Sequence, residues 1–213
     1  LSTSAKSTAL QKMWKNSAVS NTYEPGSTFK LIVAAAALEE GITSTDVAKD
    51  FYCSGSEQVA EYNIKCTGTY GHGYQTLRQA IENSCNPALI QLGKRIGATK
   101  LYTYMEAFGL FDKTGIQTAG EIMGVSHNLD TVGPVELATI SFGQRFTITP
   151  LQLITTVSAI ANDGYLMQPR IVKEIKNTDT DTITTIEPKV VRQVISTETA
   201  NEMCDIMESV VVD

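Results

Sequence analysis

The sequence lacks the features that mark several special classes of protein. Only 6 of its 213 residues are proline and 15 are glycine, while 42% are hydrophobic, which excludes a collagen-like, coiled-coil or disordered chain. Basic runs are absent, and 17 Lys and Arg against 23 Asp and Glu give a net charge of −6, so no nucleic acid is expected as a partner. The chain can instead bury one substantial core or two small ones.

Long hydrophobic runs are also absent. The longest, Leu31 to Leu38, is far shorter than the roughly 20 residues of a membrane-spanning helix. The chain also opens without the charged and apolar regions of a signal peptide. Because it begins with Leu1 and ends on Val-Val-Val-Asp, we expect an excised or processed piece whose membrane anchor lies outside it.

Hydrophobic periodicity predicts helices in most of the chain and strands only near its end. Apolar residues at helical spacing predict helices over residues 27–40, 76–84, 87–97, 149–164 and from Ser196 onward. Alternating residues predict a hairpin of residues 170–175 and 182–186, prolonged by residues 190–195. Residues 1–22 are expected to form a surface segment, and residues 51–75 an irregular loop. Helices followed by strands predict an α/β or α+β domain that ends where its sheet begins to build.

One hydroxyl and one amine stand three residues apart at the start of the first strong helix. Ser27 and Lys30 share a helix face at this spacing, so their side chains can meet. A serine nucleophile needs a base, and a lysine serves only if its pKa is lowered. The helix N-terminus and the apolar run after Lys30 both favour such a lowering. A surface serine beside a snorkelling lysine is the alternative, because S-x-x-K also occurs by chance.

The sequence around these two residues resembles the nucleophile region of class B penicillin-binding proteins, whose S-x-x-K, S-x-N and K-T-G motifs are well known. The resemblance is carried first by Tyr23-Glu24-Pro25-Gly26-Ser27-Thr28-Phe29-Lys30. It continues, in the family's order, through Gly71-His72-Gly73, Ser84-Cys85-Asn86, Thr114-Gly115-Ile116, Ser141-Phe142-Gly143-Gln144, Thr149-Pro150-Leu151-Gln152 and Ala161-Asn162-Asp163-Gly164. It covers nearly the whole chain. The resemblance is closest to elongation and division enzymes and to the stage V sporulation protein D type of Gram-positive spore formers.

The resemblance implies a role for four residues. Ser27 would be the acylated nucleophile and would also supply a backbone N–H to the oxyanion hole, with Lys30 as its base. Ser84 would relay the proton to the leaving group, and Asn86 would hydrogen-bond the substrate backbone. Asn86 could instead cap the helix that starts at Pro87, or do both.

The third family motif is where the sequence departs from the pattern. Lys113-Thr114-Gly115 spells K-T-G, but it follows Asn86 too closely, continues with Ile116, and precedes the predicted strands. We expect this match to be a coincidence. The family's K-T-G lies on a later sheet strand, so the chain would be a partial transpeptidase domain, inactive or nearly so alone.

Three cysteines and a histidine form the second candidate site. Cys53, Cys66, His72 and Cys85 follow the spacing C-x12-C-x5-H-x12-C, which is weak evidence taken alone. Three thiols and an imidazole nevertheless complete a tetrahedral structural Zn²⁺ site. Some members of the resembled family carry a metal here. We therefore predict a zinc-stapled loop region over residues 51–86 that fixes the second catalytic motif from behind.

Two alternatives to zinc remain open. A Cys53–Cys66 disulfide would suit a protein that works outside the membrane but would leave His72 and Cys85 without a role. Free thiols are the other alternative. Cys204, on the apolar side of the last predicted helix, is expected to be a small core residue.

By resemblance, the fold is that of penicillin-binding proteins and serine β-lactamases, with a helical subdomain and part of an antiparallel sheet. The implied activity is peptidoglycan D,D-transpeptidation on stem peptides ending in D-Ala-D-Ala, with β-lactam antibiotics as covalent inhibitors. The implied partner is a membrane glycosyltransferase, and the implied location is the extracytoplasmic face of the cell membrane. A non-catalytic β-lactam-sensing or scaffold domain and a serine β-lactamase are the rival hypotheses.

Overall fold

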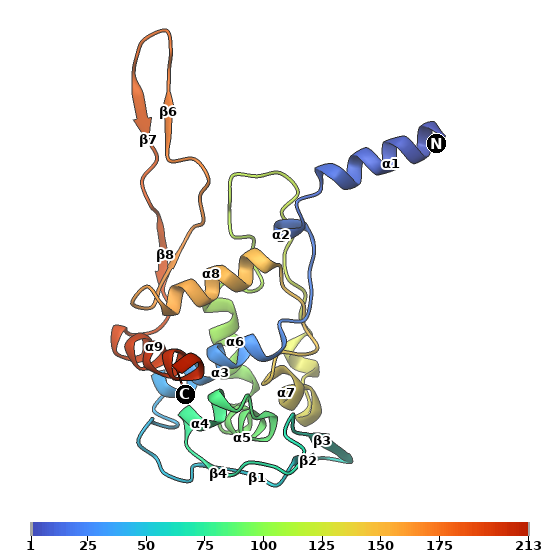
Figure 1. Ribbon diagram of the computed structural model, residues 1–213, viewed down its shortest axis with the longest axis vertical. Helices are drawn as coiled ribbons and strands as arrows, with labels where there is room; N and C mark the ends of the chain where they lie inside the picture. Colours follow the sequence, from blue (N-terminus) through green and yellow to red (C-terminus); the bar gives the residue numbers. More distant parts are fainter. Residues whose placement is uncertain (1, 213) are drawn as a thin grey trace.

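A computed structural model describes residues 2–212 and confirms a mixed helical and antiparallel fold (Figure 1). The α-helices are α1 Thr3–Trp14, α2 Ser17–Ser20, α3 Lys30–Glu39, α4 Leu77–Glu82, α5 Asn86–Ile96, α6 Ala98–Ala107, α7 Pro134–Ile140, α8 Pro150–Ile160 and α9 Thr197–Val212. Short 3-10 turns span Gly26–Phe29 and Leu129–Thr131. The strands are β1 Phe51–Cys53, β2 Ser56–Val59, β3 Tyr62–Lys65, β4 Gly73–Gln75, β5 Tyr165–Met167, β6 Glu174–Lys176, β7 Ile183–Thr185 and β8 Val190–Gln193. Among residues 2–212, no helix combines the length and the hydropathy needed to span a bilayer.

Helix α3 forms the centre of the molecule, as its apolar sequence predicted. Its residues 32–37 are completely buried and contribute to one large hydrophobic core. Helices α5, α6 and α9 pack around it (Figure 1), and its run of four alanines lets these neighbours approach closely. The first residue of this helix, Lys30, is therefore surrounded by protein.

The N-terminal segment lies on the surface, as expected, but it is helical. Helix α1 projects away from the body (Figure 1), and none of its side chains is buried; Trp14 is 78% exposed. No helical period is visible in this segment because the helix has no apolar face directed at the core.

The prediction of an irregular loop over residues 51–75 was wrong. This region contains four strands in two antiparallel pairs, β1 with β4 and β2 with β3. Each strand has three or four residues, too few to reveal an alternation in sequence. The pairing of β1 with β4 brings the two ends of the region together.

The C-terminal third agrees with prediction in part. Strands β6 and β7 form the predicted hairpin, which extends from the body (Figure 1). Strand β8 does not prolong that hairpin, because it pairs with β5 after helix α8. Helices α6 and α7 were not predicted; α7 nevertheless begins with the recognisable signals Gly133, Pro134 and Glu136.

Candidate active site and metal cluster

Ser27 lies in the 3-10 turn that leads into α3. Its side chain is exposed, while that of Lys30, one turn later, is only 2% exposed. The turn starts at Gly26, whose φ of +58° is a left-handed conformation that glycine adopts without strain. The local sequence thus presents a hydroxyl to solvent and a buried amine behind it.

The buried amine joins the first two predicted motifs. Lys30 Nζ donates hydrogen bonds to the carbonyl oxygen of Ser84 (2.6 Å), to Ser84 Oγ (2.9 Å) and to Asn86 Oδ1 (2.8 Å). These two residues are 54 and 56 positions away along the chain. Within residues 2–212, no side-chain hydrogen bond joins Lys30 to Ser27, although the Lys30 backbone N–H donates to the Ser27 carbonyl oxygen. The structure therefore assembles Lys30, Ser84 and Asn86, with Ser27 one helical turn away.

Burial lowers the pKa of Lys30 to about 8, although the thiols of Cys85 and Cys66 act in the opposite direction. The direction matches the sequence-based expectation, with desolvation as its main cause. A lysine with this pKa is partly neutral near physiological pH and can accept a proton.

The second motif occupies a tight turn between α4 and α5. Ser84 has φ of +47°, an uncommon conformation for a residue with a side chain, and one that costs about 1–2 kcal/mol. Hydrogen bonds from Ser84 N to Ile81 and from Cys85 N to Ala80 hold this turn. Such strain often accompanies functional residues.

Asn86 does not cap α5 as a simple helix-capping residue would. It is the first residue of the helix, and Cys85 is the N-cap residue without a side-chain cap bond. The Asn86 side chain instead accepts from Lys30 and donates to the carbonyl oxygen of Lys65 at 3.3 Å. The capping interpretation is therefore wrong.

A second segment holds the loop that carries Ser27. Gly26 N donates to the carbonyl oxygen of Gly143 at 2.8 Å, and Tyr23 forms an antiparallel bridge with Ile148. Glu24 Oε1 accepts a hydrogen bond from Arg145 N at 2.9 Å. Gly143 lies in a stretch that resembles the family, but no role was predicted for it; its position against Gly26 makes it a supporting residue.

Replacing Gly143 by alanine is expected to displace the Ser27 loop. An added Cβ would lie 1.9 Å from the carbonyl oxygen of Gly26, and the φ of Gly143 is +85°. We expect a loss of about 3 kcal/mol or more in stability and at least a tenfold slower reaction of Ser27 with a β-lactam. Chemical denaturation and acylation kinetics would measure the two effects.

Gly120→Ala provides the control for this variant. Gly120 has a similar φ of +82°, but no atom lies within 4 Å of an added Cβ. It therefore carries the conformational cost without the clash. Equal effects of the two substitutions on acylation would contradict the role of Gly143 beside Gly26.

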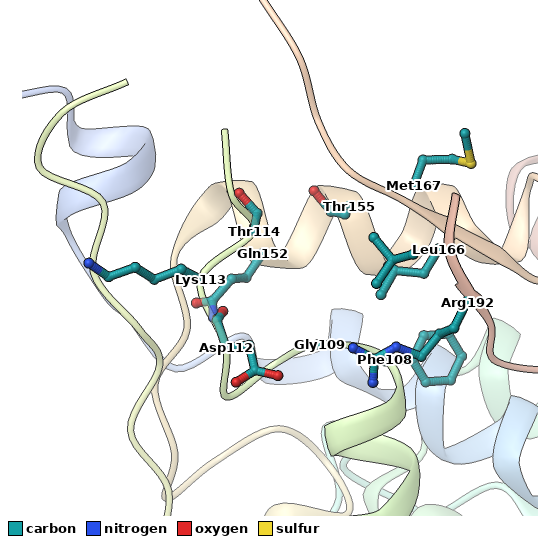
Figure 2. A pocket seen from close by; sticks show the side chains of 11 residues that line it. Phe108, Gly109, Asp112, Lys113, Thr114, Gln152, Thr155, Leu166, Met167 and Arg192 are labelled. Atoms are coloured by element: carbon teal, nitrogen blue, oxygen red, sulfur yellow. The ribbon is translucent and has the colours of Figure 1, made fainter. Parts of the chain in front are cut away.

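Lys113-Thr114-Gly115 lies in a loop outside any strand. Glu121 accepts hydrogen bonds from Thr114 and from Gly115 N. Lys113 and Thr114 border a small pocket that residues of α8, β5 and β8 also line, and in Figure 2 the Lys113 side chain extends away from it. None of the four candidate catalytic residues lines this pocket. This placement agrees with the prediction that the K-T-G match is a coincidence.

The four predicted metal ligands come together. One ligand atom each from Cys53, Cys66, His72 and Cys85 lies within 4.8 Å of all the others. Backbone hydrogen bonds from His72 N to Cys53 O (3.1 Å) and from Cys66 N to Gly55 O (2.9 Å) bring the strand ends together.

Gly71 permits this close approach. Its φ is +75°, and an added Cβ would lie 2.5 Å from the carbonyl oxygen of Cys53. The Gly71-His72-Gly73 stretch is thus a tight turn that delivers the imidazole to the cluster.

Two distances within the cluster match those between neighbouring ligands of a tetrahedral metal site. With Zn–S bonds of about 2.3 Å and Zn–N bonds of about 2.0–2.1 Å, neighbouring ligands should be about 3.8 Å apart for two sulfurs and about 3.6 Å for sulfur and nitrogen. Cys66 Sγ lies 3.9 Å from Cys85 Sγ and 3.6 Å from His72 Nδ1. All four cysteines are free thiols in this structure.

Hydrogen-bond donors surround two of the sulfurs. Burial alone would raise the pKa of Cys66, but hydrogen bonds from the N–H groups of Gly68 and Asn86 and from other thiols hold it below its usual value. Burial raises the pKa of Cys85 to about 12, although Gln75 and the Ala88 N–H oppose this rise. Such donors favour the thiolate form that binds metals.

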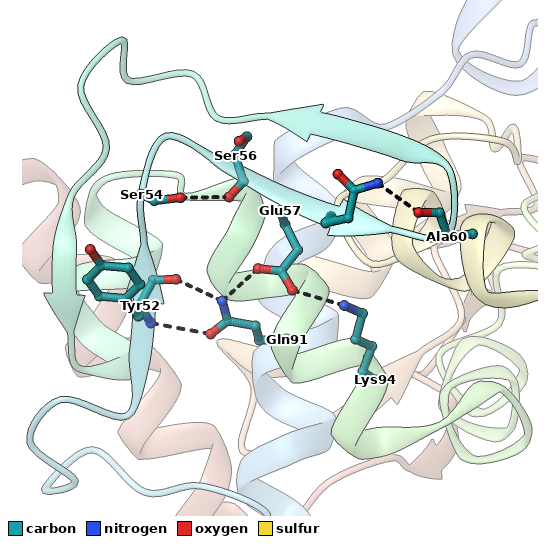
Figure 3. Close-up of polar contacts among 8 residues, drawn as sticks. Tyr52, Ser54, Ser56, Glu57, Ala60, Gln91 and Lys94 are labelled. Atoms are coloured by element: carbon teal, nitrogen blue, oxygen red, sulfur yellow. Dashed lines mark hydrogen bonds and ion pairs between the residues drawn. The ribbon is translucent and has the colours of Figure 1, made fainter.

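Side chains of helix α5 also hold strands β1 and β2, and β1 carries the ligand Cys53. Gln91 donates to the Tyr52 carbonyl oxygen at 2.7 Å and to Glu57 at 2.9 Å, and it accepts from Tyr52 N at 3.3 Å (Figure 3). Lys94 forms an ion pair with Glu57 at 2.9 Å. Helix α5 therefore carries Asn86 at its start and holds β1 and β2 further along.

Cys204 lies apart from this cluster. It is half-buried on α9, with its Sγ 3.9 Å from the carbonyl oxygen of Ile160. The expected core position is therefore only partly buried.

Comparison with known proteins gives consistent results. Residues 2–213 match the family described as the penicillin binding protein transpeptidase domain. Stage V sporulation protein D of Bacillus subtilis is 43% identical over 201 residues, which cover 93% of this chain and 31% of that protein. Peptidoglycan D,D-transpeptidase PbpA of Mycolicibacterium smegmatis is 34% identical, with coverage of 90% and 39%.

Solved structures show the same fold. Penicillin-binding protein 3 of Mycobacterium tuberculosis superposes with a TM-score of 0.84 at 30% identity, covering 93% of this chain and 44% of that one; it has been solved with aztreonam and with ampicillin. A peptidoglycan synthetase of Bifidobacterium adolescentis gives a TM-score of 0.86 at 30% identity, with coverage of 94% and 36%. The chain spans less than half the length of these relatives.

Proposed function

Because the chain belongs to the penicillin-binding protein transpeptidase family, we propose that it forms part of a peptidoglycan D,D-transpeptidase in which Ser27 is acylated. The observation that carries this proposal is the buried Lys30 amine, held at Ser84 and Asn86 one turn behind the exposed Ser27. This arrangement places a base and a relay hydroxyl behind a serine nucleophile, as acyl-transfer chemistry requires.

In the proposed reaction, Ser27 Oγ attacks the carbonyl carbon of the penultimate D-Ala of a stem peptide. Lys30, partly neutral because of its lowered pKa, accepts the hydroxyl proton. Ser84 Oγ, 2.9 Å from Lys30 Nζ, passes a proton to the departing D-Ala nitrogen, and Asn86 binds the peptide backbone. The Ser27 N–H stabilises the oxyanion. The acyl group is then transferred to an amine of a neighbouring strand.

The wider assignments rest on the relatives. Structures of a 30% identical relative with aztreonam and ampicillin support acylation of Ser27 by β-lactams. The 43% identity to a sporulation protein supports a role in cell-wall synthesis during sporulation. We further propose an extracytoplasmic location at the membrane, an anchor outside this chain, and a glycosyltransferase partner.

We also propose that the chain is inactive by itself. Lys113-Thr114-Gly115 lies in a loop, and the matched part makes up only 31% and 39% of the two curated relatives. A K-T-G strand from elsewhere in the full-length protein would bind the substrate carboxylate and complete the oxyanion hole.

For the metal cluster we propose a structural Zn²⁺ site formed by Cys53, Cys66, His72 and Cys85. The support is the donor set, the distances from Cys66 Sγ to His72 Nδ1 and to Cys85 Sγ, and the hydrogen bonds to the sulfurs. Zinc bound there would clamp Cys85, and with it the turn that presents Ser84 and Asn86 to Lys30. A Cys53–Cys66 disulfide stays the alternative, and it would leave His72 and Cys85 without a role.

A fluorescent penicillin tests the proposed nucleophile in the full-length protein. We expect stoichiometric covalent labelling that maps to the peptide containing Ser27, complete loss in Ser27→Ala, and normal labelling in Ser7→Ala, a change on the exposed helix α1. Labelling that persists in Ser27→Ala would contradict the assignment.

The same preparation separates the rival functions. Turnover of a stem peptide ending in D-Ala-D-Ala is expected for a transpeptidase, and its absence would indicate a sensing or scaffold domain. Rapid loss of the penicilloyl group would indicate a β-lactamase, because a transpeptidase retains the adduct for much longer.

A further inference from the structure

Gln75 is a buried amide whose two polar ends both have partners. It is the last residue of β4, and its side chain is 2% exposed. Its Nε2 donates to Cys85 Sγ at 3.2 Å, and its Oε1 accepts from Asn83 Nδ2 at 3.1 Å. One carboxamide thus connects the residues on either side of Ser84.

The β1–β4 pairing places Gln75 at this position. Gln75 lies opposite Phe51, and two residues earlier Gly73 lies opposite Cys53, so both pairs share the inward face. The residues between them, Tyr52 and Tyr74, are exposed. The strand pair that delivers Cys53 to the cluster therefore also delivers Gln75 to the turn of the second motif.

The chemistry of the position favours glutamine over other side chains of similar size. A glutamate would place a carboxylate against the Cys85 sulfur, which becomes an anion when a metal binds. A methionine would fill a similar volume but could donate no hydrogen bond to the sulfur. Only an uncharged amide can donate to the sulfur and accept from Asn83 together.

We infer that Gln75 is a positioning residue that ties the Cys85 metal ligand to the Ser84 turn. Its N–H···S bond orients and stabilises the Cys85 thiolate, and its bond to Asn83 holds the other side of the strained Ser84. This inference rests on the proposed zinc site and on the proposed role of Ser84. Donors around metal ligands commonly change metal affinity by about 10–100-fold when removed.

The test compares Gln75→Met and Gln75→Glu with the unchanged full-length protein. We expect zinc affinity, measured by chelator competition, to fall about 10–100-fold, with the larger loss in Gln75→Glu. In the cobalt-substituted protein, loss of the hydrogen bond should move the thiolate-to-cobalt band of Gln75→Met to longer wavelength, because the sulfur lone pairs rise in energy. The acylation rate constant should fall, while the initial affinity for penicillin stays unchanged.

Gln79→Glu is the matched control. Gln79 is exposed and forms the capping box of α4 with Thr76, a position where glutamate serves equally well. It introduces the same charge four residues away and should leave zinc affinity unchanged.

Three outcomes would overturn the inference. If the unchanged protein binds zinc but Gln75→Met has the same zinc affinity and cobalt spectrum, the inference about Gln75 fails while the zinc site stands. Failure of both Gln75 variants to fold at saturating zinc would assign Gln75 to the core instead. If the unchanged protein binds no zinc, the proposed zinc site and this inference both fail. Penicillin labelling of Ser27 would still support the acylation chemistry.

Discussion

Replacing Lys30 by methionine is expected to slow acylation of Ser27 by about 10²- to 10⁴-fold, the usual contribution of a general base. Methionine is unbranched and apolar, so it can occupy the buried position without a charge. The substitution removes the base and leaves the carbonyl oxygen of Ser84, Ser84 Oγ and Asn86 Oδ1 without their common donor. Stopped-flow acylation with a chromogenic β-lactam would separate the rate constant, which should fall, from the initial binding constant.

Lys100→Met is the control for this prediction. Lys100 is a surface lysine paired with Glu40, so its loss should leave acylation unchanged. An acylation rate in Lys30→Met within tenfold of the unchanged protein would contradict the assignment of Lys30 as the base.

The pH dependence provides a second readout of the same residue. Only the neutral amine accepts a proton, so the acylation rate should rise with pH and level off above the Lys30 pKa of about 8. This rise should be absent in Lys30→Met. A flat profile between pH 6 and 9 in the unchanged protein would assign proton acceptance to another group.

Elements with local signals were predictable from sequence. Helix α3 was predictable, because its alanines and leucines favour a helix and its lack of a polar face indicates burial. Helix α7 carried Gly133, Pro134 and Glu136 as readable signals that were missed. Strands β1 and β4 could not be found in this way, because each is three residues long and is stabilised by a partner about twenty residues away.

The geometry of the candidate site was likewise predictable from sequence only in part. The proximity of Ser27 and Lys30 follows from helix geometry, since three residues make almost one turn. The hydrogen bond from Lys30 to Ser84 spans 54 residues, and only the family resemblance anticipated it. The left-handed backbone of Ser84 and the bridging amide of Gln75 have no local signal, because both depend on how α4, α5 and β4 meet.

The Cys85→Ser variant is expected to lose bound zinc and much of the domain's stability. A serine hydroxyl is a far weaker zinc ligand than a thiolate, so the tetrahedral set of Cys53, Cys66 and His72 would be incomplete. If free zinc exceeds its dissociation constant about 1,000-fold, the lost binding lowers the free energy of unfolding by about 4 kcal/mol, or about 8–16 °C in Tm for this domain. Metal analysis, a thiol count and calorimetry on protein purified without chelator would measure these changes.

Cys204→Ser is the matched control, because Cys204 is half-buried on α9 and lies outside the cluster. It should keep about one zinc per chain, while Cys85→Ser should keep none and should also acylate more slowly, since the turn that holds Ser84 loses its anchor. No zinc in the unchanged protein, with two thiols missing from the count, would instead establish a disulfide. In that case the metal assignment fails, while the assignment of Ser27 as the acylated residue stands, because penicillin labelling tests it separately.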